Sequence, residues 1–157
     1  MKNIKAIIFD AYGTLFDVNS AAEKSRDRIG DKWESFANFW RTTQLEYTWL
    51  RSLMKRHKDF WQITEESLDK SIKTYKIDTS MKNDLLDLYK TLSPYEEVEE
   101  VLKKLKVKNF KLAILSNGTP SLLDELVKSN NFENLFDDLF SIEQVGIYKP
   151  DSKVYDM

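Results

Sequence analysis

Short apolar runs alternate with longer segments of helical periodicity along this chain. The short runs occupy residues 4–9, 111–115 and 139–142. Continuous runs of this length are typical of strands buried on both faces of a parallel sheet. We expect helices before, between and after the two later runs, at residues 94–106, 120–128 and 151–156. Strands that alternate with helices predict an α/β fold in which right-handed crossovers connect parallel strands.

The segment from residue 20 to residue 89 is too long to be an ordinary crossover. It contains one glycine and no proline, which favours helices throughout. Two stripes at helical spacing run along its first half. One comprises Phe36, Trp40, Tyr47 and Leu50, and the other comprises Arg41, Leu45, Trp49 and Leu53. We therefore expect a separate helical domain at residues 19–91, inserted into a core formed by residues 1–18 and 92–157.

The composition is that of a folded protein and indicates neither nucleic acid nor a membrane as a partner. Hydrophobic residues make up 41% of the 157 positions and aromatic residues 13%, so disorder is not expected. Twenty-four Lys and Arg balance 26 Asp and Glu without a long single-sign block, which argues against nucleic acid or an anionic membrane as a partner. Cysteine is absent, so disulfides and thiolate sites are excluded. The single histidine, His57, lies in a basic run and is expected at the solvated surface.

Nothing in the sequence indicates a membrane segment. No apolar run reaches the ~18 residues that a membrane span requires. The apolar stretch at residues 6–9 is too short for the core of a signal peptide. We therefore expect a cytoplasmic protein.

Two turns after predicted strands, and one later turn, carry polar side chains. Two of the four glycines, Gly13 and Gly118, lie just past strand ends. Ligands of open α/β sheets bind at the carboxyl ends of strands, where these turns should meet. The polar residues of the three turns are Asp10, Thr14, Ser116, Asn117 and Lys149.

Asp10 follows an apolar run at once, so its carboxyl group should stand at the rim of a dry crevice. A carboxylate there is costly without a cation, and Lys149 can supply one. An ionised, partly desolvated carboxylate is a nucleophile, and backbone N–H groups in the turns at residues 11–12 and 116–117 can hold an anion. Each of these residues also has a purely structural interpretation: Asp10 as a helix N-cap, the Ser-Asn pair as turn formers and Lys149 as a solvated surface residue. The expected convergence of three turns favours a functional site instead.

The same residues resemble motifs of a known family. Residues 9–17 (FDAYGTLFD), the triplet 116–118 (SNG) and the pair 149–150 (KP) resemble the first three motifs of the haloacid dehalogenase superfamily. Within the insertion, residues 40–41 and 44–51 resemble the cap of the L-2-haloacid dehalogenases. The resemblance covers nearly the whole chain. It implies a Rossmann-like parallel sheet with an inserted α-helical cap.

One position separates the branches of this superfamily. Its phosphatases carry a second Asp two residues after the nucleophile, which protonates the leaving oxygen and whose main chain helps to seat magnesium, whereas this chain has Tyr12. A phenol with a pKa near ~10 is a poor acid at neutral pH, while a halide leaves without a proton. The resemblance therefore implies dehalogenation without a metal or other cofactor.

By resemblance, the chain converts (S)-2-haloacids to (R)-2-hydroxyacids through an ester on Asp10. Arg41 and Asn117 would accept the halide, and Thr14 and Lys149 would orient and charge-balance Asp10. Tyr155 would support the site. The resemblance implies a substrate-binding set of Ala11, Tyr12, Arg41, Leu45, Phe60, Ser116 and Asn117.

The family's fourth motif, which activates the hydrolytic water, has no counterpart up to Met157. We therefore expect a sheet that is incomplete at its C-terminal side, with ester hydrolysis impaired. The first strand would then be a bare apolar edge, which favours a homo-oligomer, most simply a dimer. Two alternatives stay open: a catalytically degenerate remnant that acts as an interaction module, and a magnesium-dependent phosphatase.

Overall fold

The computed structural model describes residues 4–157, and residues 1–3 of the predicted core lie outside the described part. Three parallel strands form its sheet in the order β1-β2-β3. The strands are β1 (Ala6–Phe9), β2 (Lys111–Ser116) and β3 (Asp138–Ser141). In the register, Ile8 pairs with Ala113, and Ile114 pairs with Leu139. The predicted parallel α/β architecture is confirmed, and all three strands end at the same edge.

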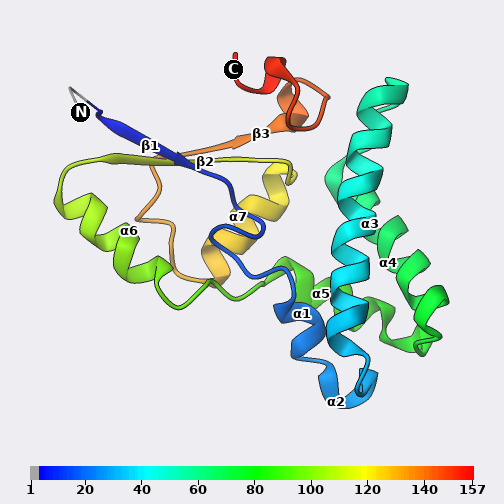
Figure 1. Ribbon diagram of the computed structural model, residues 1–157. Helices are drawn as coiled ribbons and strands as arrows, with labels where there is room; N and C mark the ends of the chain where they lie inside the picture. The colour runs from blue at the N-terminus through cyan, green and yellow to red at the C-terminus, as the bar shows by residue number, and fades with distance from the viewer. Residues whose placement is uncertain (1–3) are drawn as a thin grey trace.

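Helices α6 (Val98–Val107) and α7 (Pro120–Ser129) lie on one side of this sheet (Figure 1). Helix α7 begins as predicted, with Pro120 in its first turn and Thr119 Oγ1 accepting the N–H of Leu122 at 3.3 Å. Helix α6 begins four residues later than Pro94, where it was predicted to start. The reason is a long-range pairing, because Pro94 forms a bridge with Phe16 in the turn region after β1.

The other side of the sheet is poorly covered, which corrects the prediction of a first strand buried on both faces. Ile8 is 59% exposed, and β1 pairs with β2 alone among residues 4–157. The apolar run therefore predicted the strand correctly, but it did not indicate which face of the strand would be covered. The last predicted helix is a single 3-10 turn at Ser152–Val154, which follows another 3-10 turn at Ile142–Gln144.

The segment from residue 20 to residue 90 consists of helices joined by short turns, as predicted, and its helices stand together beside the sheet (Figure 1). They are α1 (Ser20–Glu23), α2 (Arg26–Ile29), α3 (Trp33–Met54), α4 (Phe60–Tyr75) and α5 (Lys82–Lys90), with a 3-10 turn at Thr79–Met81. The predicted core stripe of α3 is only half right. Phe36 and Trp40 are buried, but Tyr47 is half-buried and Leu50 is 50% exposed.

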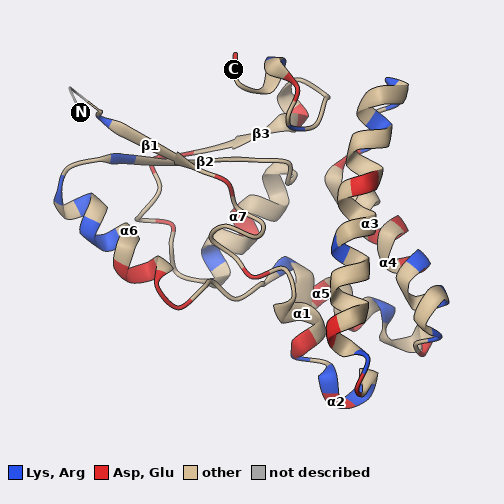
Figure 2. Ribbon diagram, in the orientation of Figure 1, with Lys and Arg blue, Asp and Glu red and all other residues tan. Residues whose placement is uncertain are grey.

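The helical segment is tied to the loop that precedes Lys149. His57 is exposed, as predicted, and its Nε2 also lies 2.9 Å from Glu143 Oε2. Tyr148 donates its hydroxyl to the carbonyl of Lys58. Figure 2 shows Lys and Arg interspersed with Asp and Glu along the helices. In the described residues no helix is long and apolar enough to cross a membrane.

Candidate active site

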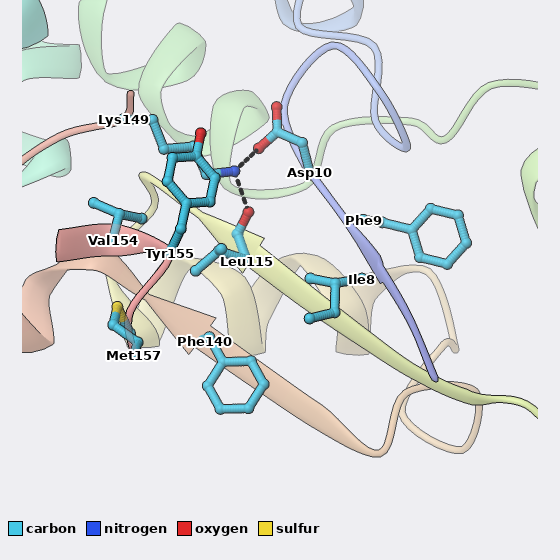
Figure 3. A pocket seen from close by; sticks show the side chains of 9 residues that line it. All are labelled: Ile8, Phe9, Asp10, Leu115, Phe140, Lys149, Val154, Tyr155 and Met157. Carbon is cyan, nitrogen blue, oxygen red and sulfur yellow. Dashed lines mark hydrogen bonds and ion pairs between the residues drawn. The ribbon is translucent and has the colours of Figure 1, made fainter. Parts of the chain in front are cut away.

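Asp10 and Lys149 meet at the carboxyl end of the sheet, although 139 positions separate them in the sequence (Figure 3). Lys149 Nζ donates to Asp10 Oδ1 at 3.1 Å and also to the carbonyl of Leu115, at the end of β2. The lysine side chain is 19% exposed and the aspartate side chain 43%. The ammonium group is therefore anchored on the strand end and holds the carboxylate at a partly solvated rim.

Asn117 is oriented by the same loop. Its Oδ1 accepts the backbone N–H of Lys149 at 3.1 Å. An amide whose oxygen is occupied in this way has its NH₂ group left to donate elsewhere. The predicted convergence of the turns after β1 and β2 with the Lys149 turn is therefore present in the structure.

A cleft of about 540 Å³ lies between α3 and these turns. Its lining residues are Asp10, Arg41, Leu45, Trp49, Asn117, Lys149 and Pro150. Three of them, Arg41, Leu45 and Trp49, are spaced by four and share one face of α3. Trp49 is absent from the substrate-binding set that the resemblance implied, but this tryptophan lines the cleft. The four-residue stripe was the signal that could have found it.

Arg41 is half-buried and presents its guanidinium to this cleft. Nη1 donates to Gln44 Oε1 at 2.9 Å, and Nη2 donates to the carbonyl of Tyr12 at 3.0 Å. A guanidinium has five N–H donors, so those not used here remain for an anion. The cleft thus combines one carboxylate, two cations and an amide with the apolar surfaces of Leu45 and Trp49.

Tyr12 and Phe60 form a layer behind the cleft instead of its wall. Tyr12 is 4% exposed and Phe60 is 1% exposed, with their ring centroids 5.1 Å apart. Tyr89 also stacks on Tyr12, with ring centroids 5.7 Å apart. Burial raises the pKa of Tyr12 well above its usual value and also raises that of Tyr89. Both phenols are therefore uncharged at neutral pH, and neither forms an ion pair with Arg41.

Ala11 and Ser116 are fully buried next to the cleft. Ser116 Oγ accepts the N–H of Gly118 at 3.1 Å, which is the geometry of a turn former. Within residues 4–157, the backbone N–H groups of Ala11 and Tyr12 find no acceptor and are free to bind an anion. Contact of these residues with a substrate stays a prediction.

Thr14 and Tyr155 do not line this cleft, although Tyr155 shares a neighbouring cavity with Asp10 and Lys149. Thr14 is exposed, and its side chain makes no hydrogen bond to Asp10 in the described part of the chain. Tyr155 is 59% exposed and lines a second cavity of about 420 Å³, on the sheet side of the Asp10–Lys149 pair (Figure 3). Their roles also stay predictions. Among residues 4–157 no group of three or more His, Cys, Asp or Glu side chains is placed to hold a metal ion.

Comparison with known proteins decides the family. The family model described as haloacid dehalogenase-like hydrolase matches residues 4–157. The chain belongs to this family. Its similar relatives include (S)-2-haloacid dehalogenase 4A of Burkholderia cepacia, 40% identical over 98% of this chain and 67% of that protein. (S)-2-haloacid dehalogenase 1 of Pseudomonas sp. (strain CBS-3) is 43% identical over 99% of this chain and 69% of that protein.

Solved structures of the family agree with the fold. A crystal structure of a dehalogenase superposes with a TM-score of 0.96 at 39% identity, covering 99% of this chain and 70% of that one. The L-2-haloacid dehalogenase from Xanthobacter autotrophicus with chloropropionic acid covalently bound gives a TM-score of 0.89 at 38% identity, covering 98% of this chain and 63% of that one. The family resemblance predicted from the motifs is therefore confirmed.

Proposed function

We propose that this family member hydrolyses short (S)-2-haloacids to (R)-2-hydroxyacids through an ester on Asp10. The observation that carries the proposal is the Asp10–Lys149 contact of 3.1 Å on the wall of a cleft that also presents Arg41 and Asn117. A carboxylate paired with an ammonium group at the edge of a cleft is a competent nucleophile. The similar relatives named (S)-2-haloacid dehalogenases support the same reaction.

In the first step, Asp10 attacks C2 of the substrate from the side opposite the halogen. Oδ1 is occupied by Lys149, so the attacking atom is Oδ2. The electrons of the carbon–halogen bond leave with the halide, which Arg41 and the amide of Asn117 receive. The configuration at C2 is inverted, and an ester joins C2 to the aspartate.

In the second step, water attacks the carbonyl carbon of the ester. The bond from that carbon to the ester oxygen, which is the former Oδ2, breaks, and this oxygen leaves on C2 of the (R)-2-hydroxyacid with one of the water protons. The water oxygen stays on Asp10, and the second proton is lost to solvent as the carboxylate is restored. We assign the substrate carboxylate to Ser116 and to the N–H groups of Ala11 and Tyr12, and orientation and support of the site to Thr14 and Tyr155. No metal or cofactor enters this scheme, because a halide leaves without an acid.

The magnesium phosphatase alternative is not favoured by the site. The position that would carry its acid is Tyr12, a neutral phenol stacked behind the cleft. The interaction-module alternative does not account for four polar groups that converge on one cleft. We therefore retain the dehalogenase.

The test is halide release from (S)- and (R)-2-chloropropanoate. We expect release from the (S)-enantiomer alone and its loss in Asp10→Asn. Asp138→Asn, which removes an exposed carboxylate at the start of β3, is the matched control and should retain activity. Equal release by Asp10→Asn, or release of phosphate from a phosphomonoester in the presence of magnesium, would contradict the proposal.

The remaining assignments are also proposals. We place the core at residues 1–18 and 92–157 and the cap at residues 19–91. A dimer is supported by the exposed apolar edge strand, where Ile8 is 59% exposed, and by Leu53, which is 80% exposed on α3. We propose a cytoplasmic enzyme with a 2-haloacid substrate and with neither nucleic acid nor membrane as a partner.

A further inference from the structure

Behind Arg41 lies a buried amide that does not line the cleft. Gln44 is 1% exposed, and its Oε1 accepts a hydrogen bond from Arg41 Nη1 at 2.9 Å. The other anchored nitrogen, Nη2, donates to the carbonyl of Tyr12. The guanidinium is therefore held on one side by the core and on the other by an amide of its own helix.

The orientation of this amide is set by its other neighbours. Thr64 Oγ1 donates to the carbonyl of Phe60 at 2.8 Å, so its oxygen is left to accept from Gln44 Nε2 at 2.7 Å. The hydroxyl of Tyr89 lies 3.0 Å from Nε2 and 3.2 Å from Oε1. Because Nε2 must face Thr64, Oε1 must face Arg41. A flipped amide would place two donors against each other.

We propose that Gln44 is a positioning residue that aims Arg41 into the cleft while leaving its positive charge unpaired. A neutral oxygen anchors the guanidinium without cancelling its charge, whereas a carboxylate there would compete with the incoming anion. Arg41 thereby receives its orientation from α4 and α5 through a chain of buried hydrogen bonds. The inference rests on the proposed function only for its view that the anion is the departing halide.

The test compares Gln44→Leu, Gln44→Glu and the matched control Thr48→Val. Thr48 is fully buried one turn further along α3, and within the described residues its hydroxyl bonds only to the carbonyl of Leu45. Chloride binding is measured by line broadening in chloride NMR, which needs no turnover, with Arg41→Leu as the reference for complete loss. We expect chloride affinity to fall about 10-fold in Gln44→Leu and further in Gln44→Glu, and to be unchanged in Thr48→Val.

A second measurement separates positioning from mere support of the fold. A residue that acts on the departing halide affects the poorer leaving group more. The ratio of kcat/KM for (S)-2-bromopropanoate to that for (S)-2-chloropropanoate should therefore rise several-fold in Gln44→Leu and stay constant in Thr48→Val. This ratio is independent of how much of the protein is folded.

The outcomes are distinguishable. Unchanged chloride affinity in Gln44→Leu would overturn the inference, as would chloride binding that does not depend on Arg41. If the unaltered chain releases no halide but its chloride affinity follows the expected order, the proposed function fails and the positioning role stands. If halide is released and chloride affinity is unchanged by the Gln44 variants, only the positioning role fails.

Discussion

Gly118 marks the closest approach between the turn after β2 and the aromatic layer behind the cleft. A Cβ at this position would lie 2.8 Å from Tyr12 Cε2 and 3.1 Å from Leu123 Cδ2. Carbon atoms in contact normally stand about 3.5–4.0 Å apart, so the overlap with Tyr12 is about 0.7 Å or more. Gly118 is not among the glycines with positive φ, so Gly118→Ala isolates this steric effect.

The ring of Tyr12 is closely packed. Phe60 and Tyr89 both contact it, and all three side chains are buried. Overpacking of this kind costs about 1–3 kcal/mol. In a chain of this length, Tm should fall by about 2–4 °C per kcal/mol, hence by about 2–12 °C in Gly118→Ala. Because the carbonyl of Tyr12 holds Arg41, halide release should fall on the order of 10- to 100-fold.

The assay is calorimetric Tm together with halide release, measured for Gly118→Ala, Tyr12→Leu and the double variant. Removing the ring opens the space that the new methyl group needs. The two substitutions should therefore be non-additive by about 0.5 kcal/mol or more, with the double variant more stable than the sum predicts. Strict additivity, or a Gly118→Ala protein with unchanged Tm and rate, would refute the steric reasoning.

Three further predictions concern the cleft and its surroundings. Trp49→Ala removes an indole from the cleft wall and should raise the activity on 2-chlorohexanoate relative to 2-chloropropanoate several-fold; an unchanged ratio in a competition assay would remove Trp49 from the substrate contact. Lys149→Met takes the cation from Asp10 and should reduce halide release at least about 100-fold, whereas Lys153→Met, at an exposed neighbouring position, should leave it unchanged. Burial raises the pKa of Tyr12, so the folded state favours the neutral phenol: its contribution is complete below the unfolded value of about 10 and is lost as pH rises above it. Tyr12→Phe should therefore show a shallower fall of Tm than the unaltered chain in thermal scans from about pH 9 to 11, and parallel curves would contradict this assignment.

Much of the site was predictable because it depends on topology. Short apolar runs gave the three strands, and parallel strands end at one edge, so Asp10, Asn117 and Lys149 had to meet there. Resemblance to the family added Arg41 and Leu45, which α3 delivers to the same cleft.

The predictions that failed depend on long-range packing, which a local sequence pattern does not determine. An apolar run at β1 does not say whether a helix will cover its second face, and Ile8 is largely exposed. Helix α6 starts late because Pro94 pairs with Phe16, far away in the sequence. Gln44 lies in the segment that resembles the family's cap, but the sequence assigned it no role, since its partners on α4 and α5 are known only from the fold.

The central claim is that the carboxylate of Asp10 itself displaces the halide. The direct test is to incubate the protein with (S)-2-chloropropanoate, quench it within the first turnover, and compare chloride released per chain with the mass of the peptide that contains residue 10. The account predicts that the first chloride appears together with one propanoate unit esterified on Asp10. Chloride release with an unmodified Asp10 in every quenched sample, or a propanoate unit on another residue, would contradict it.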